Sequence, residues 1–506
     1  MKPLISPDTM RACEARYFVQ SGIPSITVME RAAEALARSI REILPKGASI
    51  AFACGTGGNG GDGTACARLL HKEYRCTIVQ LRAPSTSDAV VNLNRARDCG
   101  VSILTQLSEL PTVRPHVWVD ALFGTGLSRA PAGDDDALIR RITEDHAHGA
   151  YVLSADIPSG LNGATGKAYA PCVVADRTVT FQYMKTGLAL GDGLDVCGEI
   201  IVADVGFPDE FFHPMDAMLL EQMDIARTLS RRPRNIHKGN CGHLLIIAGS
   251  FGMTGAAMLC AMAALRSGAG LVTVACPVSI VPMLQTTVPQ AMCVPLPEEE
   301  GAICRDALAK LREAFIGKDA IVVGCGLSRR TAPEILQAVL ECGLPSVIDA
   351  DALNLISLHP ALAKLLRPHH ILTPHPGEAR RLPAPHNSEG ETLPVPFDDA
   401  VNAAKVLSLH SATVLYKGAA CAIAGESETY VSASGCCGMA RGGSGDILSG
   451  IMGTLLAEPS DRSPALTAAL ASEIHGRAGE LAQRKYGERG MNSRDIIEFL
   501  PQVFME

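Results

Sequence analysis

The feature that most constrains the fold is a glycine-rich turn that leads directly into an apolar helical pattern, Gly442-Gly443-Ser444-Gly445-Asp446-Ile447-Leu448. Glycines let backbone N–H groups approach anionic oxygens, and a helix N-terminus favours negative charge. Asp446 is placed to accept the proton of a hydroxyl that attacks phosphorus. The alternative, which this segment alone leaves open, is that Asp446 only caps the helix.

Length and composition favour two compact α/β domains. The chain has 506 residues, of which 47% are hydrophobic and 19% charged, with 48 glycines. That length exceeds a single typical core, and the composition is neither disordered nor fibrous. The net charge is −8 and no block of Lys or Arg occurs, which excludes the electrostatic footprint of a nucleic-acid-binding protein.

No segment predicts export or membrane insertion. The residues from Met1 to Tyr17 mix charged and apolar side chains and lack the apolar core of a secretory signal. The longest apolar stretch, Phe251 to Leu265, is too short to span a bilayer. We therefore expect a cytoplasmic protein with no membrane partner.

The 17 cysteines are predicted to be reduced thiols, because no C-x-x-C pair occurs and most lie in apolar segments. The adjacent pair Cys436-Cys437 lies close to Asp446, where oxidation would matter. Neighbouring cysteines rarely meet disulfide geometry, so a redox role is disfavoured.

The first half of the chain reads as one α/β unit. A buried strand at 49–54 is followed by a glycine-rich loop, Gly55 to Gly63, and a helical run to Tyr74. Further strands are predicted at 76–81, 116–121, 151–155, 177–181 and 199–204, and their alternation with helices indicates a mostly parallel sheet. Residues 209–223 carry no clear sheet signal, and we place the domain boundary at Pro214.

The second half predicts another doubly wound sheet. Strands are expected at 243–248, 271–275, 320–324, 346–349, 371–373 and 413–416, and helices at 254–265, 332–341 and 398–409. The proline-rich segment 383–396 is predicted to be a surface loop.

Polar side chains follow several strands of the first unit. Asn59, Asp120, Asp156 and Ser159 all fall where parallel strands end, so they are expected to meet in one crevice. Their oxygens suit a hard cation, while an acid beside a reactive carbon suits proton transfer. The alternative is that the two aspartates only bind turn amides.

These motifs resemble two enzyme families in tandem. Gly58 to Gly63, Asp120 to Leu127 and Asp156 to Leu161 are similar to the NAD(P)H-hydrate epimerase domain. The second half resembles ADP/ATP-dependent NAD(P)H-hydrate dehydratases in five further motifs: 237–239, 268–272, 349–354, 375–378 and 442–446. The resemblance implies two three-layer αβα domains, a Rossmann-like epimerase domain over 1–214 and a ribokinase-like dehydratase domain over 215–506.

The resemblance also implies the substrates. These are NADHX and NADPHX, reduced nicotinamide nucleotides that have gained water and carry a hydroxyl at C6 in R or S form. The first domain would interconvert the epimers. The second would phosphorylate the hydroxyl of the S form with ADP or ATP and magnesium, and eliminate phosphate to restore NAD(P)H. A homo-oligomer is expected.

The implied epimerase site consists of residues carried over from the matching motifs. Asp156 is the implied catalytic residue and contacts the hydrate, and Asn59, Asp120 and Ser159 are the implied potassium ligands. The hydrate-binding positions are Gly58, Asn59, Gly60, Gly61, Asp62, Gly124, Thr125, Gly126, Leu127, Ser128, Arg129, Ala130 and Asp156.

The implied dehydratase site has Asp446 as its catalytic residue. The hydrate-binding positions are Ala256, Gly326, His375 and Asp446, and Glu378 is implied to position magnesium through water. The nucleotide-binding positions are Lys417, Gly418, Ala419, Ala420, Cys421, Gly442, Gly443 and Gly445. From the residues alone, His375 also suits a turn and Lys417 a solvated strand end.

One departure from the family pattern is visible. Cys436-Cys437 stands where Asn-Pro is expected before the glycine-rich loop, which leaves the preference between ADP and ATP open. Two other functions stay open at this point. The second domain resembles the fold of ordinary small-molecule kinases, which keep the phosphate in the product, and the first domain has relatives that are non-catalytic binding modules.

Overall fold

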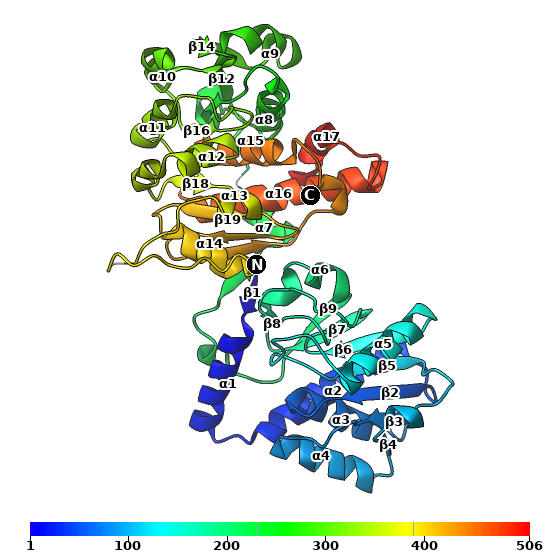
Figure 1. Cartoon of the computed structure of the whole chain (residues 1–506). Coiled ribbons are helices and arrows are strands. Elements are labelled where there is room, and N and C mark those ends of the chain that lie inside the picture. Colours follow the sequence, from blue (N-terminus) through cyan, green and yellow to red (C-terminus); the bar gives the residue numbers. More distant parts are fainter. Residues whose placement is uncertain (230, 388, 506) are drawn as a thin grey trace. The chain divides into compact units, whose positions relative to one another are not determined.

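The computed structural model describes residues 1–229, 231–387 and 389–505, and the chain divides into two compact units. The first is Pro3–Ala217, and the second runs from Met218 onward and includes Met1–Lys2 (Figure 1). The chain passes between the units after Ala217, whereas the sequence placed the boundary at Pro214.

The first unit is built on a seven-stranded parallel sheet, as predicted. Its order is β4-β3-β2-β5-β6-β7-β9, so the strand order reverses on either side of β2. The strands are β2 (Ser49–Cys54), β3 (Arg75–Val79), β4 (Ser102–Leu104), β5 (Val117–Ala121), β6 (Tyr151–Ala155), β7 (Arg177–Phe181) and β9 (Glu199–Ala203). Outside this sheet, β1 (Lys2–Ile5) pairs in parallel with β8 (Met184–Lys185).

Two hydrophobic clusters cover the two faces of this sheet. Alternate residues of β2 divide between them: Ile50 and Phe52 belong to one cluster, and Ala51 and Ala53 to the other. The first cluster includes residues of α1 (Pro7–Ser21), α2 (Ser25–Ile43), α3 (Gly58–Leu70) and α4 (Ser87–Asp98), and the second includes residues of α5 (Asp134–Ala147). Because strand side chains alternate between faces, this division confirms the three-layer arrangement.

The predicted glycine loop is shorter than expected. Helix α3 begins at Gly58 and ends at Leu70, so the prediction of a loop to Gly63 and a helix to Tyr74 is wrong. The glycines in its first turns serve close packing: a Cβ on Gly60 would lie 1.9 Å from the Gly55 carbonyl oxygen, and one on Gly63 would lie 2.6 Å from Ala121 Cβ. The glycine run therefore brings α3 against the strands instead of keeping the chain out of a helix.

The second unit contains the predicted second parallel sheet, extended by antiparallel strands. The parallel part has the order β13-β12-β11-β16-β17-β18-β19, and β20 and β21 follow β19 as antiparallel neighbours. The strands are β11 (His243–Ile247), β12 (Leu271–Pro277), β13 (Met292–Leu296), β16 (Ala320–Val323), β17 (Ser346–Ile348), β18 (His370–Leu372), β19 (Thr413–Tyr416), β20 (Cys421–Ala424) and β21 (Thr429–Ser432).

Helices cover this sheet on both faces. Leu244 and Ile246 of β11 pack in one cluster with residues of four helices: α8 (Thr254–Arg266), α15 (Ser444–Ala457), α16 (Pro464–Tyr486) and α17 (Ser493–Val503). The intervening Leu245 and Ile247 are also fully buried, so they face the opposite layer. The crossover helices α11 (Pro333–Glu341) and α14 (Ala400–Ser408) lie close to the predicted ranges, whereas α12 (Asp351–Leu358) was not predicted.

The remaining elements show one error in the prediction. Residues 209–223 include a strand, β10 (Ala217–Leu219), which pairs in parallel with β21. Three residues are too few to produce a readable alternation. In the predicted loop 383–396, Ser388 lies outside the described residues, and the others form only an isolated bridge between His386 and Thr392.

Gly450 tests the packing of α15 on α8. We expect Gly450→Ala to lower the free energy of unfolding by about 1–3 kcal/mol, because its Cβ would lie 2.2 Å from the Cys260 carbonyl oxygen. Overpacking then outweighs the gain of about 1 kcal/mol in helix propensity. Denaturation followed by circular dichroism measures the change. The matched control is Gly255→Ala in α8, where nothing lies within 4 Å, so this change is expected to stabilise. Equal effects of the two changes would contradict the packing.

Candidate active sites of the two domains

The first unit gathers its predicted polar residues at the point where the strand order reverses. Asn59 lies in the first turn of α3 after β2, Asp120 lies in β5, and Asp156 follows β6. A Cβ on Gly124 would lie 3.4 Å from Asn59 Cγ and 3.5 Å from Asp156 Oδ2. The structure therefore brings these groups together at the crevice where open parallel sheets bind ligands.

Asp120 and Ser159 form a buried hydrogen-bonded pair beside Asn59. Asp120 Oδ1 accepts from Ser159 Oγ at 2.5 Å, and its Oδ2 accepts from Ser159 N at 2.8 Å and Ser154 Oγ at 2.9 Å. Burial raises the pKa of Asp120, and these hydrogen bonds oppose that rise. Asn59 Oδ1 is buried and has no hydrogen-bond partner among the described residues. Asn59 Nδ2 donates to the Phe123 carbonyl oxygen, and Phe123 N donates to Ser159 Oγ. A buried oxygen without a hydrogen-bond partner, on a residue linked in this way to Ser159, fits the coordination of a hard cation.

Asp156 forms an ion pair that the sequence did not predict. Its carboxylate lies 2.6 Å from Lys185 Nζ, and the Lys185 side chain is 1% exposed. Thr180 Oγ1 donates to Asp156 Oδ1 at 3.0 Å. Asp156 has a φ of 64°, a strained conformation for a non-glycine residue and one that is common at functional sites. The sequence gives no local motif for Lys185, which lies between Met184 and Thr186.

Two further carboxyl groups lie in the electrostatic surroundings of this ion pair. Burial raises the pKa of Glu14, on α1, to about 7, and it raises the pKa of Asp62, on α3, well above its usual range. The negative charge of Asp156 adds to both shifts, while Lys185 opposes them. Sequence reasoning included Asp62 but missed Glu14.

The predicted loop from Gly124 to Ala130 is held at two points. Arg11 of α1 donates to the Thr125 carbonyl oxygen at 2.7 Å, and Tyr169 donates to that of Ser128 at 3.1 Å. The loop thus lies between α1 and the segment that follows β6.

In the second unit, Asp446 lies in the first turn of α15. Gly443, with a φ of 92°, occupies the capping position, so the interpretation of Asp446 as the helix cap is wrong. Ligand atoms of Asp446, Asp349 and Cys325 lie within 4.8 Å of one another. Burial and the nearby Asp349 raise the pKa of Asp446 to about 6. A carboxyl group with this pKa is suited to accept a proton at neutral pH.

Asp349 forms a saturated network with Lys417. Asp349 Oδ1 accepts from Lys417 Nζ at 2.8 Å and Thr373 Oγ1 at 2.7 Å, and its Oδ2 accepts from Ser449 Oγ at 2.8 Å. Burial would raise the pKa of Asp349, but Lys417 and these hydrogen bonds lower it overall. The Lys417 side chain is only 20% exposed, which contradicts the alternative that Lys417 is a solvated strand end. A Cβ on Gly445 would lie 3.6 Å from Lys417 Nζ, so this cation lies beside the glycine-rich turn.

The other predicted dehydratase residues lie around the carboxyl ends of the strands. Ala256 and Gly326 are adjacent, since a Cβ on Gly326 would lie 2.8 Å from Ala256 Cβ. His375 caps α13 (Pro376–Ala379), because its ring Nδ1 accepts from Gly377 N at 3.0 Å. The backbone N–H of His375 donates to Glu378 Oε2 at 3.0 Å. His375 thus has the structural role that was left open, beside the buried Glu378, whose charge acts on Lys417.

His475 is a residue that sequence reasoning missed. It lies in α16 with its Nε2 3.3 Å from Ser444 Oγ of the glycine-rich turn. Burial and the nearby Lys417 lower the pKa of His475 to about 4, which keeps the ring neutral at pH 7. Ser493 supports the same turn by donating to the Gly442 carbonyl oxygen at 2.7 Å. No local motif surrounds either residue, so only the fold brings them here.

The approach to this turn is held by backbone hydrogen bonds to α16. Gly435 N donates to Glu480 and Gly438 N to Gln483, each at 3.0 Å. A hydrogen bond to Glu488 raises the pKa of Cys437, and burial raises that of Cys436, so both thiols stay protonated. All seventeen cysteines are free, as predicted.

Comparison with known proteins decides the family. Residues 244–502 match a family model described as NAD(P)H-hydrate dehydratase, and residues 25–187 match one described as YjeF-related protein N-terminus. The bifunctional NAD(P)H-hydrate repair enzyme of Moorella thermoacetica is 36% identical over 95% of this chain and 92% of its own length. That of Coxiella burnetii is 37% identical over 96% of both chains. The chain belongs to the bifunctional NAD(P)H-hydrate repair enzyme family.

A solved structure is also similar to the second unit of this repair enzyme. The ADP/ATP-dependent NAD(P)H-hydrate dehydratase from Bacillus subtilis, co-crystallized with ATP/Mg2+, is 27% identical over 57% of this chain and 99% of its own, with a TM-score of 0.47. The full-length relatives carry the repair-enzyme name, so the resemblance drawn from the motifs is confirmed. Family membership therefore disfavours both alternatives, the ordinary kinase and the non-catalytic first domain.

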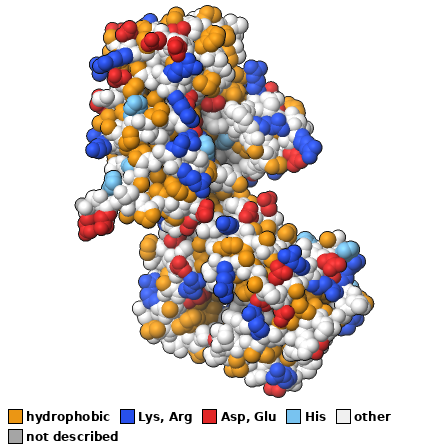
Figure 2. All heavy atoms as spheres, viewed as in Figure 1, with side chains coloured by type: hydrophobic (Ala, Val, Ile, Leu, Met, Phe, Trp, Pro, Cys, Tyr) orange, Lys and Arg blue, Asp and Glu red, His pale blue; other side chains and the backbone are white. Residues whose placement is uncertain are grey.

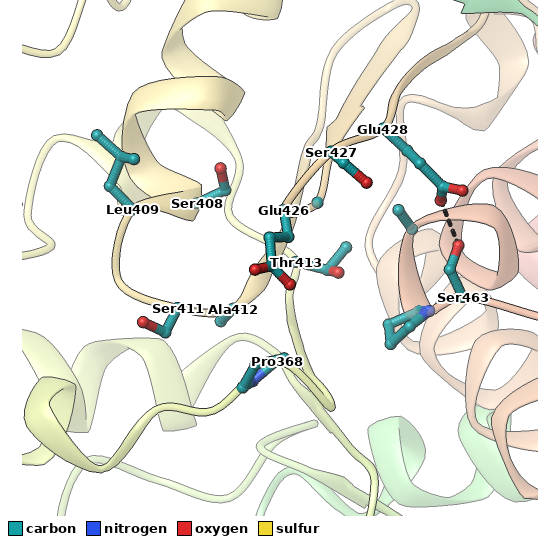
Figure 3. A pocket seen from close by; sticks show the side chains of 13 residues that line it. Pro368, Ser408, Leu409, Ser411, Ala412, Thr413, Glu426, Ser427, Glu428 and Ser463 are labelled. Carbon is teal, nitrogen blue, oxygen red and sulfur yellow. Dashed lines mark hydrogen bonds between the residues drawn. The ribbon is translucent and has the colours of Figure 1, made fainter.

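A hollow in the second unit lies away from these residues. It has a volume of about 380 Å³ and is lined by residues such as Pro368, Thr413 and Glu426 (Figure 3). Thr413 begins β19, whereas Lys417 follows the other end of that strand, so the hollow lies at the opposite edge of the sheet. Its Glu428 is already hydrogen-bonded to Ser463.

The surface agrees with the charge pattern of the sequence. Figure 2 shows Lys and Arg side chains interspersed with Asp and Glu over the visible face. Among the described residues, no helix combines the length and the apolar character that crossing a membrane would require.

Replacing Lys417 tests the buried network of the repair enzyme's second unit. We expect Lys417→Met to lower the free energy of unfolding by about 3–5 kcal/mol at pH 7, because it leaves Asp349 buried without its cation. A carboxyl whose pKa is lowered on folding contributes stability above its unfolded pKa and loses it as the pH falls. The gap between variant and wild type should therefore narrow toward acid pH.

Urea denaturation from neutral to acid pH measures this gap. Lys364→Met, at an exposed lysine, is the matched control and is expected to change little. A gap that stays constant with pH would contradict the ionised pair.

Proposed function

We propose that this chain repairs hydrated NADH and NADPH with two active sites, an epimerase in the first unit and a nucleotide-dependent dehydratase in the second. The observation that carries the proposal is Asp446, whose pKa is about 6, at the start of a glycine-rich helix in the region that matches the dehydratase family. The Asp156–Lys185 ion pair at the sheet switch point supports the epimerase assignment.

In the dehydratase reaction, we assign the proton transfer to Asp446. The ionised carboxylate accepts the proton of the C6 hydroxyl while that oxygen attacks the terminal phosphorus of ADP or ATP. The N–H groups of Gly442, Gly443 and Gly445 stabilise the charge that develops on the phosphoryl oxygens. Departure of phosphate with the C6–O electron pair, together with loss of the neighbouring ring proton, restores the double bond of NAD(P)H.

The Lys417–Asp349 pair has two effects on this proposed reaction. Its cation lies beside Gly445, where it favours anionic phosphate oxygens. Its carboxylate, in addition to burial, raises the pKa of Asp446 toward neutrality. Lys417 therefore acts from beneath the glycine-rich turn, together with the predicted nucleotide positions Gly418, Ala419, Ala420 and Cys421.

Magnesium fits the carboxylates at this edge. Glu378 is buried and close enough to Lys417 for its charge to act there, and we assign it to hold the ion through water, as the family resemblance implies. When bound with the nucleotide, the ion neutralises phosphate charge.

In the epimerase reaction, we assign acid–base chemistry to Asp156 and hydrate binding to the loops around it. Lys185, at 2.6 Å, stabilises the negative charge of Asp156. Asn59, Asp120 and Ser159 would hold potassium, since Asn59 Oδ1 is buried without a hydrogen-bond partner among the described residues. The bound cation would order the loops and offset the charge of the diphosphate.

Crossed variants test the assignment of the two activities. Asp446→Asn is expected to lower the rate of S-hydrate dehydration by roughly 10²–10⁴-fold and to leave epimerisation unchanged. Asp156→Asn is expected to do the reverse, so each variant is the control for the other. Wild-type dehydration should also fall below pH about 6, as Asp446 becomes protonated.

The measurement is recovery of nicotinamide absorbance from separated R and S hydrates, with ADP and ATP in parallel. Full dehydration by Asp446→Asn would exclude the proposed chemistry. Phosphorylated hydrate as the final product would indicate an ordinary kinase.

Potassium is tested by exchange of the cation. Replacing potassium by tetramethylammonium should lower the epimerase rate and the thermal midpoint of the first unit, because a ligand that binds only the folded state stabilises it. Trp118, the single tryptophan, is buried in β5 and reports this midpoint by fluorescence. Asn59→Ala should raise the potassium concentration that gives half of this effect by about 10–100-fold. Identical behaviour in both salts would remove potassium from the proposal.

The homo-oligomeric state stays a prediction. Light scattering of the purified full chain measures its mass directly.

A further inference from the structure

Glu14 occupies a position where the helix pattern calls for an apolar side chain. Pro7, Met10 and Tyr17 of α1 are buried, and Glu14 is spaced four residues after Met10 and three before Tyr17. Residues at this spacing share one face of a helix, so Glu14 lies on the face that packs against the domain. A carboxyl group on such a face is costly unless a partner or a function retains it.

This face of α1 lies against the epimerase site. Arg11, one turn before Glu14, donates to the Thr125 carbonyl oxygen at 2.7 Å. A Cβ on Gly163, in the segment that follows Asp156, would lie 3.0 Å from Pro7 Cγ. The helix thus contacts both the loop after β5 and the segment after β6.

Glu14 has no hydrogen bond or ion pair with any residue in the described part of the chain. The charged groups that act on it are Asp156 after β6, Lys185 of β8 and Arg11 of its own helix, and Asp62 of α3 is coupled to it as well. The Lys185 ammonium is already paired with Asp156 at 2.6 Å. The site therefore holds one carboxyl group with a counter-ion, Asp156, and two without one, Glu14 and Asp62, and such different environments separate an acid from a base.

We propose that Glu14 is the second proton-transfer group of the epimerase, acting with Asp156 on the two faces of the hydrated nicotinamide ring. This inference rests on the proposed function. Because C6 carries both the hydroxyl and the ring nitrogen N1, loss of the hydroxyl is assisted by the nitrogen lone pair.

Protonated Glu14 donates its proton to the C6 hydroxyl, the C6–O bond breaks with its electron pair on oxygen, and water leaves as N1 and C6 become doubly bonded. Asp156 then takes a proton from a water on the other face, whose oxygen adds to C6 while the double-bond electrons return to N1. One water leaves and one enters, and the proton on Asp156 returns to Glu14 through solvent.

The same pair serves both directions of the reaction. In the reverse direction Asp156 is the acid and Glu14 the base, so each direction needs one proton on the pair. The wild-type rate should therefore decline above pH about 7, as the pair loses this proton.

The test is epimerisation of separated R hydrate by the full chain without nucleotide, with the spontaneous rate subtracted. Glu14→Gln is expected to lower the rate roughly 10²–10⁴-fold and to abolish the decline above neutral pH. Glu14→Asp should restore part of the rate together with the decline. Glu34→Gln, at an exposed glutamate of α2, is the matched control and should behave as wild type.

Two measurements separate the outcomes. The thermal midpoint from Trp118 fluorescence shows whether the first unit of each variant is folded, and dehydration of S hydrate should be unchanged in all of them. A folded Glu14→Gln variant that epimerises at the wild-type rate, or that keeps the alkaline decline, overturns the role of Glu14. Wild-type protein that does not epimerise overturns the proposed function itself.

Discussion

The chemistry of both units depends on a lysine buried against an aspartate at the carboxyl edge of a parallel sheet. Lys417 lies 2.8 Å from Asp349, and Lys185 lies 2.6 Å from Asp156. Neither lysine is mostly exposed, and Lys417 opposes the effect of burial on the pKa of Asp349. Burial, together with the negative charge of these aspartates, raises the pKa of a second carboxyl group nearby, Asp446 in one unit and Glu14 in the other.

Close backbone packing is what brings these charges into place. Gly60 and Gly63 let α3 approach the strands of the first sheet, and Gly450 lets α15 approach α8 in the second. A Cβ added to any of these three glycines would lie 2.6 Å or less from a neighbouring atom. The glycine-rich segments therefore set the position of a helix N-terminus relative to a sheet edge, and the site residues in the first turn of each helix, Asn59 of α3 and Asp446 of α15, depend on that position.

Much of the fold was predictable from local patterns. The strands at 151–155, 177–181 and 413–416 have the predicted bounds, because long buried runs between turn residues leave little ambiguity. The start of α3 was not predictable, since glycines at 58–63 favour a loop by propensity and only packing against Ala121 and Gly55 makes them helical. The strand β10 was missed because its three residues gain their regular conformation from β21.

The sequence by itself determined the two α/β units and the family, and it predicted the candidate reactive residues that lie in motifs: Asp446 in its glycine-rich turn, and Asp156 in Asp-Ile-Pro-Ser-Gly. Local motifs suffice there because the chemistry needs those residues close together along the chain. Only the tertiary structure revealed Lys185, Glu14 and His475, and it excluded the alternative that Lys417 is a solvated strand end, because Lys417 is the counter-ion of Asp349. Their effect is electrostatic and acts through space, so it depends on distances that the order of residues does not record.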